Sequence, residues 1–519
     1  MTLTRTYTST FPDVEIPESL LTPYVLRHAE RLAGEPALID GPSARTVTYG
    51  EFAAAVKSFA GGLAASGFEP GDVLALMAPN LPEYAIVFHG TAWAGGAVTT
   101  VNPTYTAGEV RHQLEDSGAK LLVTVSMFAD IAAEAVEGTA VKEIVCIDSG
   151  GPGRSLADLL GEPLLEHAPA GIDEPVCLPY SSGTTGLSKG VVLTHRNLVA
   201  NLAQMAAVVE IAEGENVLSF LPFFHIYGMQ VLMNGALASG GTVVTMPRFD
   251  LEQFLDLLQE YKVRRAFVVP PVVLAMAKHP LVDDYDLSAI EQLFSAAAPL
   301  GADLAEAAAT RLSCEVVQGY GMTELSPVTH LTPDGQYKAG TIGLLVPSTE
   351  CRIVDPETGE DCEIGGEGEI WIRGPQVMQG YLNNPDATAA TIDPEGWLHT
   401  GDIAHIDSDG HFTIVDRLKE LIKYKGFQVP PAELEALLVK HPEVLDAAVI
   451  GVADDEAGEV PKAFISLGDG ASATAESIKA FVAENVAHYK QLHFVEFVES
   501  IPKSASGKIL RRLLRDGGA

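Results

Sequence analysis

Residues 180–190 read YSSGTTGLSKG and lie between two apolar runs, at 176–178 and 190–193. The glycines let the backbone approach a ligand closely, and the hydroxyl groups and Lys189 add donors, so the loop suits a phosphate group. A flexible linker is the alternative, but linkers seldom connect two apolar strands. Because Lys189 follows Gly186 by three residues and precedes another glycine, the common Gly-x4-Gly-Lys-Ser/Thr pattern is absent. The candidate phosphate-binding residues are Ser181, Ser182, Gly183, Thr184, Thr185, Gly186 and Lys189.

On both sides of this loop, short β-rich runs alternate with helical stretches rich in Ala and Leu. Strands are expected at 73–77, 121–125, 144–147, 242–245 and 266–269, and helices at 52–65, 109–117 and 302–312. This βαβ order is typical of wound α/β sheets. It predicts that most of the chain forms one large region of this class.

The pattern changes after about residue 340. Short alternating strands with Gly and Asp turns, at 368–373 and 405–415, predict hairpins or a small β-barrel. The last hundred residues carry a helix around Leu434 and Leu438, a strand at 448–450 and a helix at 475–486, which indicates a separate α+β unit. The expected fold is therefore α/β and α+β multidomain, with a large N-terminal domain (1–418) of wound sheets plus a small barrel, and a small C-terminal domain (419–519).

Composition limits the possible partners. The 519 residues hold 33 Lys and Arg against 69 Asp and Glu, a formal net charge of −36, which argues against nucleic acid or an anionic membrane as a main partner. The uncharged stretch 216–247 contains Pro and several Gly residues, so a buried strand–turn–helix–strand explains it better than a membrane span. Five scattered cysteines without a Cys-x-x-Cys pair, and an N-terminus without an apolar signal segment, favour the cytoplasm.

Six further motifs follow the glycine-rich loop in order along the chain. They are FFHIYG (223–228), GYGMTE (319–324), GEIWIRG (368–374), WLHTGD (397–402), DRLKELIKYKGFQV (416–429) and PKSASGK (502–508). With this set the chain resembles the adenylate-forming superfamily of acyl-CoA synthetases, luciferases and adenylation domains, and most closely the 4-coumarate–CoA ligase-like enzymes. The resemblance implies an ATP-dependent acid–CoA ligase that uses Mg²⁺ and coenzyme A. It would form an acyl-AMP and then an acyl-CoA thioester.

The resemblance also assigns roles in the first half-reaction. Lys508 would bridge the substrate carboxylate and the α-phosphate, Thr323 would donate to phosphate, Glu324 would hold Mg²⁺, and the glycine-rich loop would bind the β- and γ-phosphates. Tyr320 would stack on adenine between Gly319 and Gly321, beside Gln318, and Asp402 and Arg417 would bind the ribose. Outside these motifs, Lys508 would more often be a solvated cation and Tyr320 a core residue.

Other assignments concern a second half-reaction and a mobile C-terminal domain. His225 would gate the carboxylate site, although by itself it reads as a core histidine. Lys419 would be the hinge, Lys423 and Gln428 would contact the nucleotide or acyl carbonyl during thioester formation, and Lys425 and Gly426 would border the CoA tunnel. A solvated basic turn is the alternative for these lysines.

By the same resemblance, the acyl group would lie in a small apolar pocket with one phenol, suited to planar aromatic or medium-length acids. Its residues are Tyr227, Val231, Ala296, Ala297, Gly319, Gly321 and Val328. The sequence departs from the family pattern at Ser188, where Pro is usual, and at Ala296, where Gly is usual; one methyl group is worth about 1–3 kcal/mol in discrimination. The expected substrates are 4-coumarate- or cinnamate-like acids. The alternatives are a medium- or long-chain fatty acyl-CoA synthetase and a non-catalytic nucleotide-binding or carrier-loading module.

Overall fold

The computed structural model describes residues 5–148, 150–151, 153–181, 188–425, 427–454, 456–468, 470–504 and 507–515. Its first sheet holds nine strands around a parallel centre. In spatial order the parallel strands are β9 (Pro175–Cys177), β5 (Ala97–Thr100), β4 (Val73–Met77), β6 (Leu121–Thr124), β7 (Glu143–Cys146) and β8 (Arg154–Ser155). The antiparallel strand β11 (Lys189–Thr194) extends the sheet beyond β9, with β10 (Tyr180–Ser181) and β21 (Gly380–Tyr381) paired to it.

Two further sheets continue the α/β region. The second has the order β12 (Asn216–Ser219), β13 (Thr242–Thr245), β2 (Pro36–Asp40) and β3 (Arg45–Thr48). The third has the order β14 (Arg265–Val268), β15 (Gln292–Ser295), β16 (Glu315–Gly321), β17 (Val328–Leu331) and β18 (Leu344–Leu345), of which the first three are parallel. The strands predicted in this region are confirmed to within about a residue at each end.

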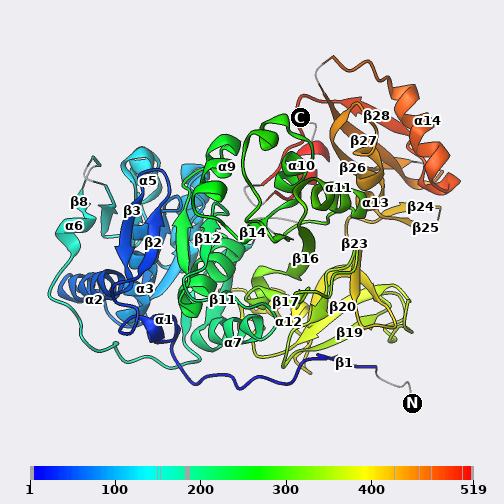
Figure 1. Cartoon of the computed structure of the whole chain (residues 1–519). Coiled ribbons are helices and arrows are strands. Elements are labelled where there is room, and N and C mark those ends of the chain that lie inside the picture. The colour runs from blue at the N-terminus through cyan, green and yellow to red at the C-terminus, as the bar shows by residue number, and fades with distance from the viewer. Residues whose placement is uncertain are drawn as a thin grey trace.

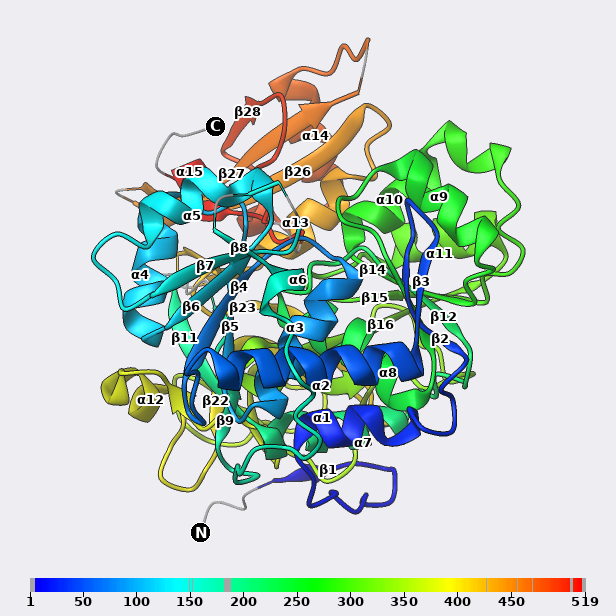
Figure 2. The same cartoon turned by 90° about the vertical axis from the view of Figure 1, so that its left-hand side faces the viewer.

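Helices pack between and around these sheets (Figure 2). In α3 (Pro82–Trp93), every residue except Glu83 is buried, as expected of a helix enclosed on all sides. The other main helices are α2 (Tyr49–Ala65), α4 (Ala107–Ser117), α7 (His195–Ala206), α9 (Leu251–Glu260), α10 (Pro270–Lys278) and α11 (Ala302–Leu312). The predicted helix at 302–312 has the observed bounds, and the other two begin two or three residues earlier than predicted.

The uncharged stretch forms β12, the π-helical turn η3 (Tyr227–Asn234), α8 (Gly235–Ser239) and β13, so its prediction is confirmed. Its first helical part, η3, is buried throughout. Within the described ranges, no helix combines the length and the apolarity needed to cross a membrane.

The strands after residue 340 curl into the predicted small barrel. The antiparallel order is β1 (Tyr7–Thr8), β19 (Glu350–Val354), β20 (Gly368–Arg373), β22 (Leu398–Ile406) and β23 (Phe412–Arg417). A bridge between Gly343 and Phe412 joins β23 to the β17–β18 hairpin, and Ser9 Oγ donates to the Leu345 carbonyl on the other side. Tyr7 and Phe412 pack edge to face across the interior.

The C-terminal residues form a small α+β unit with its own buried core (Figure 1, orange to red). Its elements are β24 (Ile422–Tyr424), β25 (Phe427–Val429), α13 (Pro431–Leu438), β26 (Val444–Asp454), β27 (Gly458–Leu467), α14 (Ala475–Asn485), β28 (Phe494–Phe497) and α15 (Arg511–Arg515). This agrees with the predicted fold class. The boundary between residues 418 and 419 stays a prediction.

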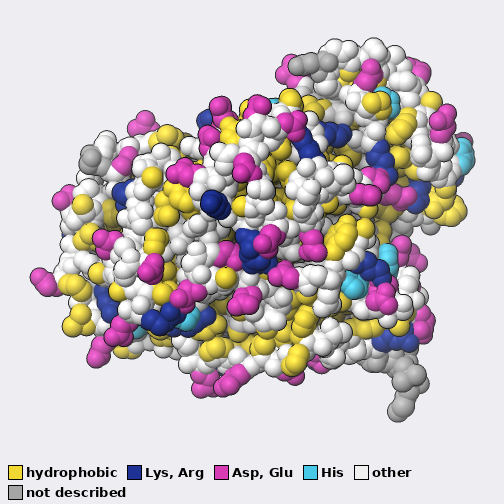
Figure 3. Space-filling view, viewed as in Figure 1, with side chains coloured by type: hydrophobic (Ala, Val, Ile, Leu, Met, Phe, Trp, Pro, Cys, Tyr) yellow, Lys and Arg dark blue, Asp and Glu magenta, His cyan; other side chains and the backbone are white. Residues whose placement is uncertain are grey.

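Acidic side chains are spread more widely than basic ones over the face shown in Figure 3. In Figure 3, Asp and Glu are scattered over the whole face, and Lys and Arg form only small groups among them. On this face, and with a net charge of −36 for the whole chain, we expect an anionic ligand to be bound by a local group of cations.

Candidate active site

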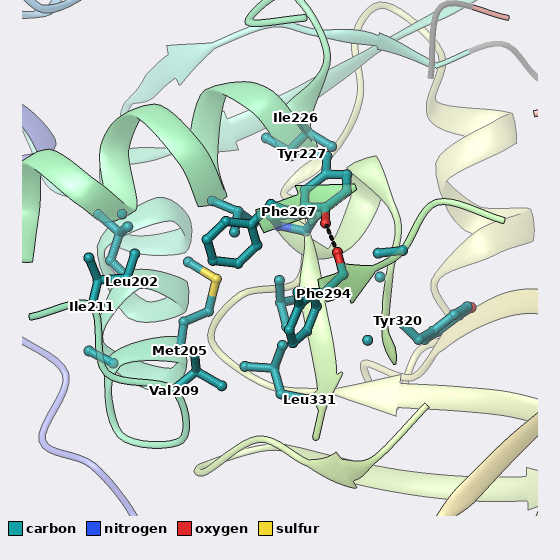
Figure 4. Close-up of a pocket in the computed structure, with 18 of the residues that line it drawn as sticks. Leu202, Met205, Val209, Ile211, Ile226, Tyr227, Phe267, Phe294, Tyr320 and Leu331 are labelled. Atoms are coloured by element: carbon teal, nitrogen blue, oxygen red, sulfur yellow. Dashed lines mark hydrogen bonds between the residues drawn. The ribbon is translucent and has the colours of Figure 1, made fainter. Parts of the chain in front are cut away.

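A cavity opens at the carboxyl ends of β14, β15 and β16, against η3 and α7 (Figure 4). The carboxyl edge of parallel strands is the usual ligand-binding position in α/β sheets. Residues from three of the sequence motifs (223–228, 319–324 and 502–508) and from the turn that holds Ala296 and Ala297 meet there. Of the predicted site residues, those lining the cavity are His225, Tyr227, Val231, Ala296, Ala297, Gly319, Tyr320, Gly321, Thr323, Val328 and Lys508.

Lys508 reaches this cavity from the C-terminal unit. Its segment rests on the large domain, where Gly507 lies against Val269 and Pro271. Burial, together with the positive charge of Arg417, lowers the pKa of Lys508 to about 8, and the carboxylates of Asp402 and Glu324 offset part of this effect. The ammonium group is therefore a charged donor beside His225 and Thr323 in a largely apolar cavity.

His225 lies beside Lys508 at the same mouth. Burial lowers the pKa of His225 to about 3, and the Lys508 charge acts in the same direction. The Tyr227 amide N–H donates to His225 Nδ1 at 3.3 Å. The imidazole is thus neutral at ordinary pH and acts as a neutral polar group, not as a cation.

The predicted ribose and adenine residues form a second cluster beside the cavity. Tyr320 Oη donates to Asp402 Oδ2 at 2.5 Å, and Arg417 Nε donates to Asp402 Oδ1 at 3.1 Å. Burial, reinforced by the Asp402 charge, raises the pKa of Tyr320 well above its usual value. Both oxygens of Asp402 are held by these donors, which fixes the carboxylate at the edge of the site.

Gly319 and Gly321 lie so close to neighbouring atoms that neither position can hold a side chain. A Cβ atom on Gly319 would lie 2.7 Å from Phe294 Cζ, and one on Gly321 would lie 2.1 Å from the Pro327 carbonyl oxygen. Tyr320 can occupy its position only because both neighbours lack a side chain. These two glycines shape the path of the backbone at the end of β16.

A third cluster surrounds Glu324, and it contains a residue that the sequence did not indicate. Ser181 Oγ and Tyr381 Oη both donate to Glu324 Oε1 at 2.9 Å. Lys189 Nζ lies 3.9 Å from the centre of the Tyr381 ring. Tyr381 thus connects the carboxylate to the lysine. No motif marked Tyr381, because it reaches this position through the pairing of β21 with β11.

Glu324 is the residue proposed to hold Mg²⁺, and the surrounding residues fit such a role. The described residues contain no group of three or more His, Cys, Asp or Glu side chains placed to bind a metal. Mg²⁺ does not need one, because it is commonly bound by one or two carboxylates together with substrate phosphates and water. A single carboxylate oriented by Ser181 and Tyr381 agrees with that mode.

The acyl part of the cavity is apolar. Tyr227 Oη donates to the Phe294 carbonyl at 3.2 Å, so its hydroxyl is already engaged within the protein (Figure 4). Ala297 has a positive φ of 74°, an uncommon conformation for a residue other than glycine. Ser188, the other departure from the family pattern, lies near Tyr105; burial raises the pKa of Tyr105, and Ser188 opposes this shift.

Several predicted residues do not line the cavity. The side-chain oxygen of Gln318 accepts from the Leu300 N–H, so it holds the neighbouring turn. Lys423 and Gln428 are cross-strand partners on the exposed β24–β25 hairpin, with Lys425 in the turn between the strands. Lys419 precedes that hairpin. Ser182, Gly183, Thr184, Thr185, Gly186 and Gly426 lie outside the described residues. The roles of all these residues stay predictions.

Comparison with known proteins agrees with this arrangement. Residues 25–382 match the AMP-binding enzyme family, and residues 433–508 match the AMP-binding enzyme C-terminal domain. The chain is 43% identical to 4-coumarate–CoA ligase 2 of Nicotiana tabacum, over 98% of this chain and 96% of the relative. It is 44% identical to 4-coumarate–CoA ligase of Pinus taeda, over 98% and 97%.

Solved structures show the same fold at lower identity. The anthranilate CoA ligase AuaEII, in complex with anthranoyl-AMP, is 26% identical with a TM-score of 0.89, covering 97% of this chain and 98% of the other. ATP-bound MatB from Rhodopseudomonas palustris is 28% identical with a TM-score of 0.87, covering 95% and 98%. Apo MatB, also 28% identical and covering 96% and 99%, gives 0.77. The two family models match most of the chain, the relatives align over nearly all of it, and the solved structures share its two-domain fold. This protein therefore belongs to the AMP-binding enzyme family.

Proposed function

We propose that this protein is an AMP-forming acid–CoA ligase that activates aromatic carboxylic acids with ATP and transfers the acyl group to coenzyme A. The observation that carries the proposal is the position of Lys508, a cation brought by the C-terminal unit to the mouth of an apolar cavity, beside His225 and Thr323. Identities of 43% and 44% to 4-coumarate–CoA ligases, over 98% of this chain, support both the reaction and the class of acid.

In the first half-reaction the substrate carboxylate attacks the α-phosphate of ATP, and pyrophosphate leaves. Both reactants are anionic, so catalysis depends on positioning and on neutralising charge. Lys508 would contact the carboxylate and the α-phosphate, and Thr323 would donate to phosphate. Tyr320 would stack on adenine, and Asp402 and Arg417 would bind the ribose.

The remaining phosphates would lie near the Glu324 cluster. Lys189 and Ser181 flank the glycine-rich segment and would bind the β- and γ-phosphates. Glu324 would hold Mg²⁺, which supplies neutralising charge to the phosphate oxygens. Tyr381 would keep the Glu324 carboxylate in position.

In the second half-reaction a thiolate attacks the acyl-AMP and AMP leaves. We propose that the C-terminal domain, 419–519, rotates about Lys419 to bring Lys423, Gln428, Lys425 and Gly426 to the site. Two half-reactions that need different groups at one carbonyl can share a pocket if a domain moves. In support, the fold agrees better with the ATP-bound form of MatB than with its apo form.

The experiment combines the protein with ATP, Mg²⁺, coenzyme A and a panel of hydroxycinnamic, benzoic and fatty acids, and follows AMP and free thiol. Equal formation of AMP and loss of thiol is expected with aromatic acids. AMP without thiol loss would contradict the ligase function and favour a carrier-loading module. No AMP with any acid would favour a non-catalytic protein.

The matched variants are Lys508→Gln and Arg512→Gln. Arg512 is an exposed cation four residues along the same tail. Loss of a preorganised donor typically lowers the rate by about 10²–10³-fold. This loss is expected in pyrophosphate release for Lys508→Gln, whereas Arg512→Gln is expected to behave as the wild type.

A further inference from the structure

The cavity continues well beyond the predicted acyl pocket. On the η3–α8 helix, Tyr227, Val231, Gly235 and Ala238 all line it, at spacings of three or four residues. Such spacings place side chains on one face of a helix. The eleven steps from Tyr227 to Ala238 span up to roughly 16 Å at about 1.5 Å per residue. The cavity is therefore a channel that follows one helix face.

Another wall of this channel comes from α7 and the segment that follows it. Leu202, Met205 and Val209 line the cavity at spacings of three and four residues, and Ile211 follows them. In Figure 4 these four apolar residues lie together on the side away from Tyr320. Methionine is unbranched and flexible, so Met205 can adapt to an inserted chain.

The far part of the channel is wide on its α8 side. Gly235 and Ala238 are small, and a Cβ on Gly235 would meet only the Gln230 carbonyl oxygen, at 3.4 Å, and Ile211 Cδ1, at 3.9 Å. Tyr24 and Arg27 lie at the far end, with the guanidinium 4.0 Å above the Tyr24 ring. Arg27 is exposed, so the channel ends near the surface.

From this geometry we infer that the enzyme also accepts acids with a long, unbranched apolar tail, which lies between α7 and α8 beyond the position of an aromatic ring. The inference rests on the proposed function, because it places such an acid with its carboxylate at Lys508. The walls beyond Val231 carry no charged side chain until Arg27. A planar phenylpropenoid acid would leave this section unfilled, whereas an alkyl chain would bury methylene groups along it.

The test measures kcat/KM for hexanoate, octanoate, decanoate and dodecanoate beside 4-coumarate. Each added methylene is expected to raise kcat/KM by up to about fourfold, which corresponds to about 0.8 kcal/mol. The Gly235→Leu variant fills the far section, so the ratio of kcat/KM for dodecanoate to that for hexanoate should fall at least about tenfold. The matched control is Gly108→Leu, an exposed helical glycine on α4 with open space around it.

Binding is measured separately by displacement of a fluorescent fatty acid, with thermal unfolding as a check on folding. Dodecanoate should displace the probe better than hexanoate from the wild type and from Gly108→Leu, and lose this advantage in Gly235→Leu. If Gly235→Leu fails to fold, Ala238→Leu takes its place. Activity with 4-coumarate without any gain along the alkyl series would overturn the inference alone. No AMP from any acid would instead overturn the proposed function, while the displacement result would still decide whether the channel binds tails.

Discussion

Lys508 is a donor whose charge depends on pH in the working range. Its pKa of about 8 is well below that of a free lysine because burial and Arg417 disfavour the charged form. The protonated form, which dominates below pH 8, would donate to the carboxylate and phosphate. Adenylation is therefore expected to decline as pH rises through about 8. The pKa of His225 is lowered to about 3, so this side chain is neutral throughout the range. Its titration therefore does not change the adenylation rate above pH 5.

The measurement is kcat/KM for ATP in pyrophosphate release between pH 6 and 10, because this quantity reports groups of the free enzyme. Lys508→Arg keeps a positive charge at every pH used. Its activity is expected to be lower, but without the decline near pH 8. A decline at the same pH in both proteins would assign it to another group.

Tyr381 offers a second prediction for a single residue. Tyr381→Phe removes the hydroxyl donor to Glu324 but keeps the ring under Lys189. A hydrogen bond to a charged group is worth about 1.5–3 kcal/mol. The expected result is a loss of adenylation of about 10- to 100-fold and a higher Mg²⁺ requirement. Tyr84→Phe is the control, since the structure records no partner for its buried hydroxyl among the described residues; equal losses in both variants would contradict the role.

At the scale of elements, a buried ion pair joins two helices of the C-terminal unit. Arg511 on α15 donates from Nη2 to both Glu435 oxygens, each at 2.7 Å, and the two side chains are only 16% and 13% exposed. Burial raises the pKa of Glu435 even though Arg511 opposes the shift. The pair therefore holds α15, and with it the segment that carries Lys508, against α13.

Arg511→Met should leave Glu435 buried without its partner. Removal of one member of a buried pair typically destabilises by about 3–5 kcal/mol. We expect faster proteolysis of the C-terminal unit and a lower unfolding temperature. The double variant Glu435→Met/Arg511→Met should recover most of the loss, because it leaves no uncompensated charge. Equal stability of the single and double variants would contradict this account.

Elements with a strong local pattern could be predicted from the sequence. The alternation in 368–373 and the periodicity in 302–312 gave the observed bounds of β20 and α11. The π-helical winding of η3 and the pairing of β21 with β11 could not be predicted, because both depend on contacts between distant segments. Tyr381 was missed for this reason, as it meets Glu324 only when β21 pairs with β11.

For the whole molecule, the motifs predicted which residues meet at the cavity but not the position of the C-terminal unit. Residues 223–228 and 502–508 lie far apart in sequence, and the structure places His225 and Lys508 in one cavity. No local pattern encodes that arrangement, because it depends on how two separately folded cores rest on each other. Lys423 and Gln428, predicted from the same family pattern, lie on an exposed hairpin away from the cavity.

The net charge of −36 is a property of the whole chain, and it predicts how stability depends on salt. Charge far from zero destabilises a compact state by repulsion. The screening length falls from about 30 Å at 0.01 M salt to about 3 Å at 1 M. The unfolding temperature should therefore rise by several degrees between 0.01 and 1 M NaCl, and by a similar amount in KCl. A constant or falling unfolding temperature would show that the surface ion pairs, which salt also screens, outweigh the repulsion among the excess carboxylates.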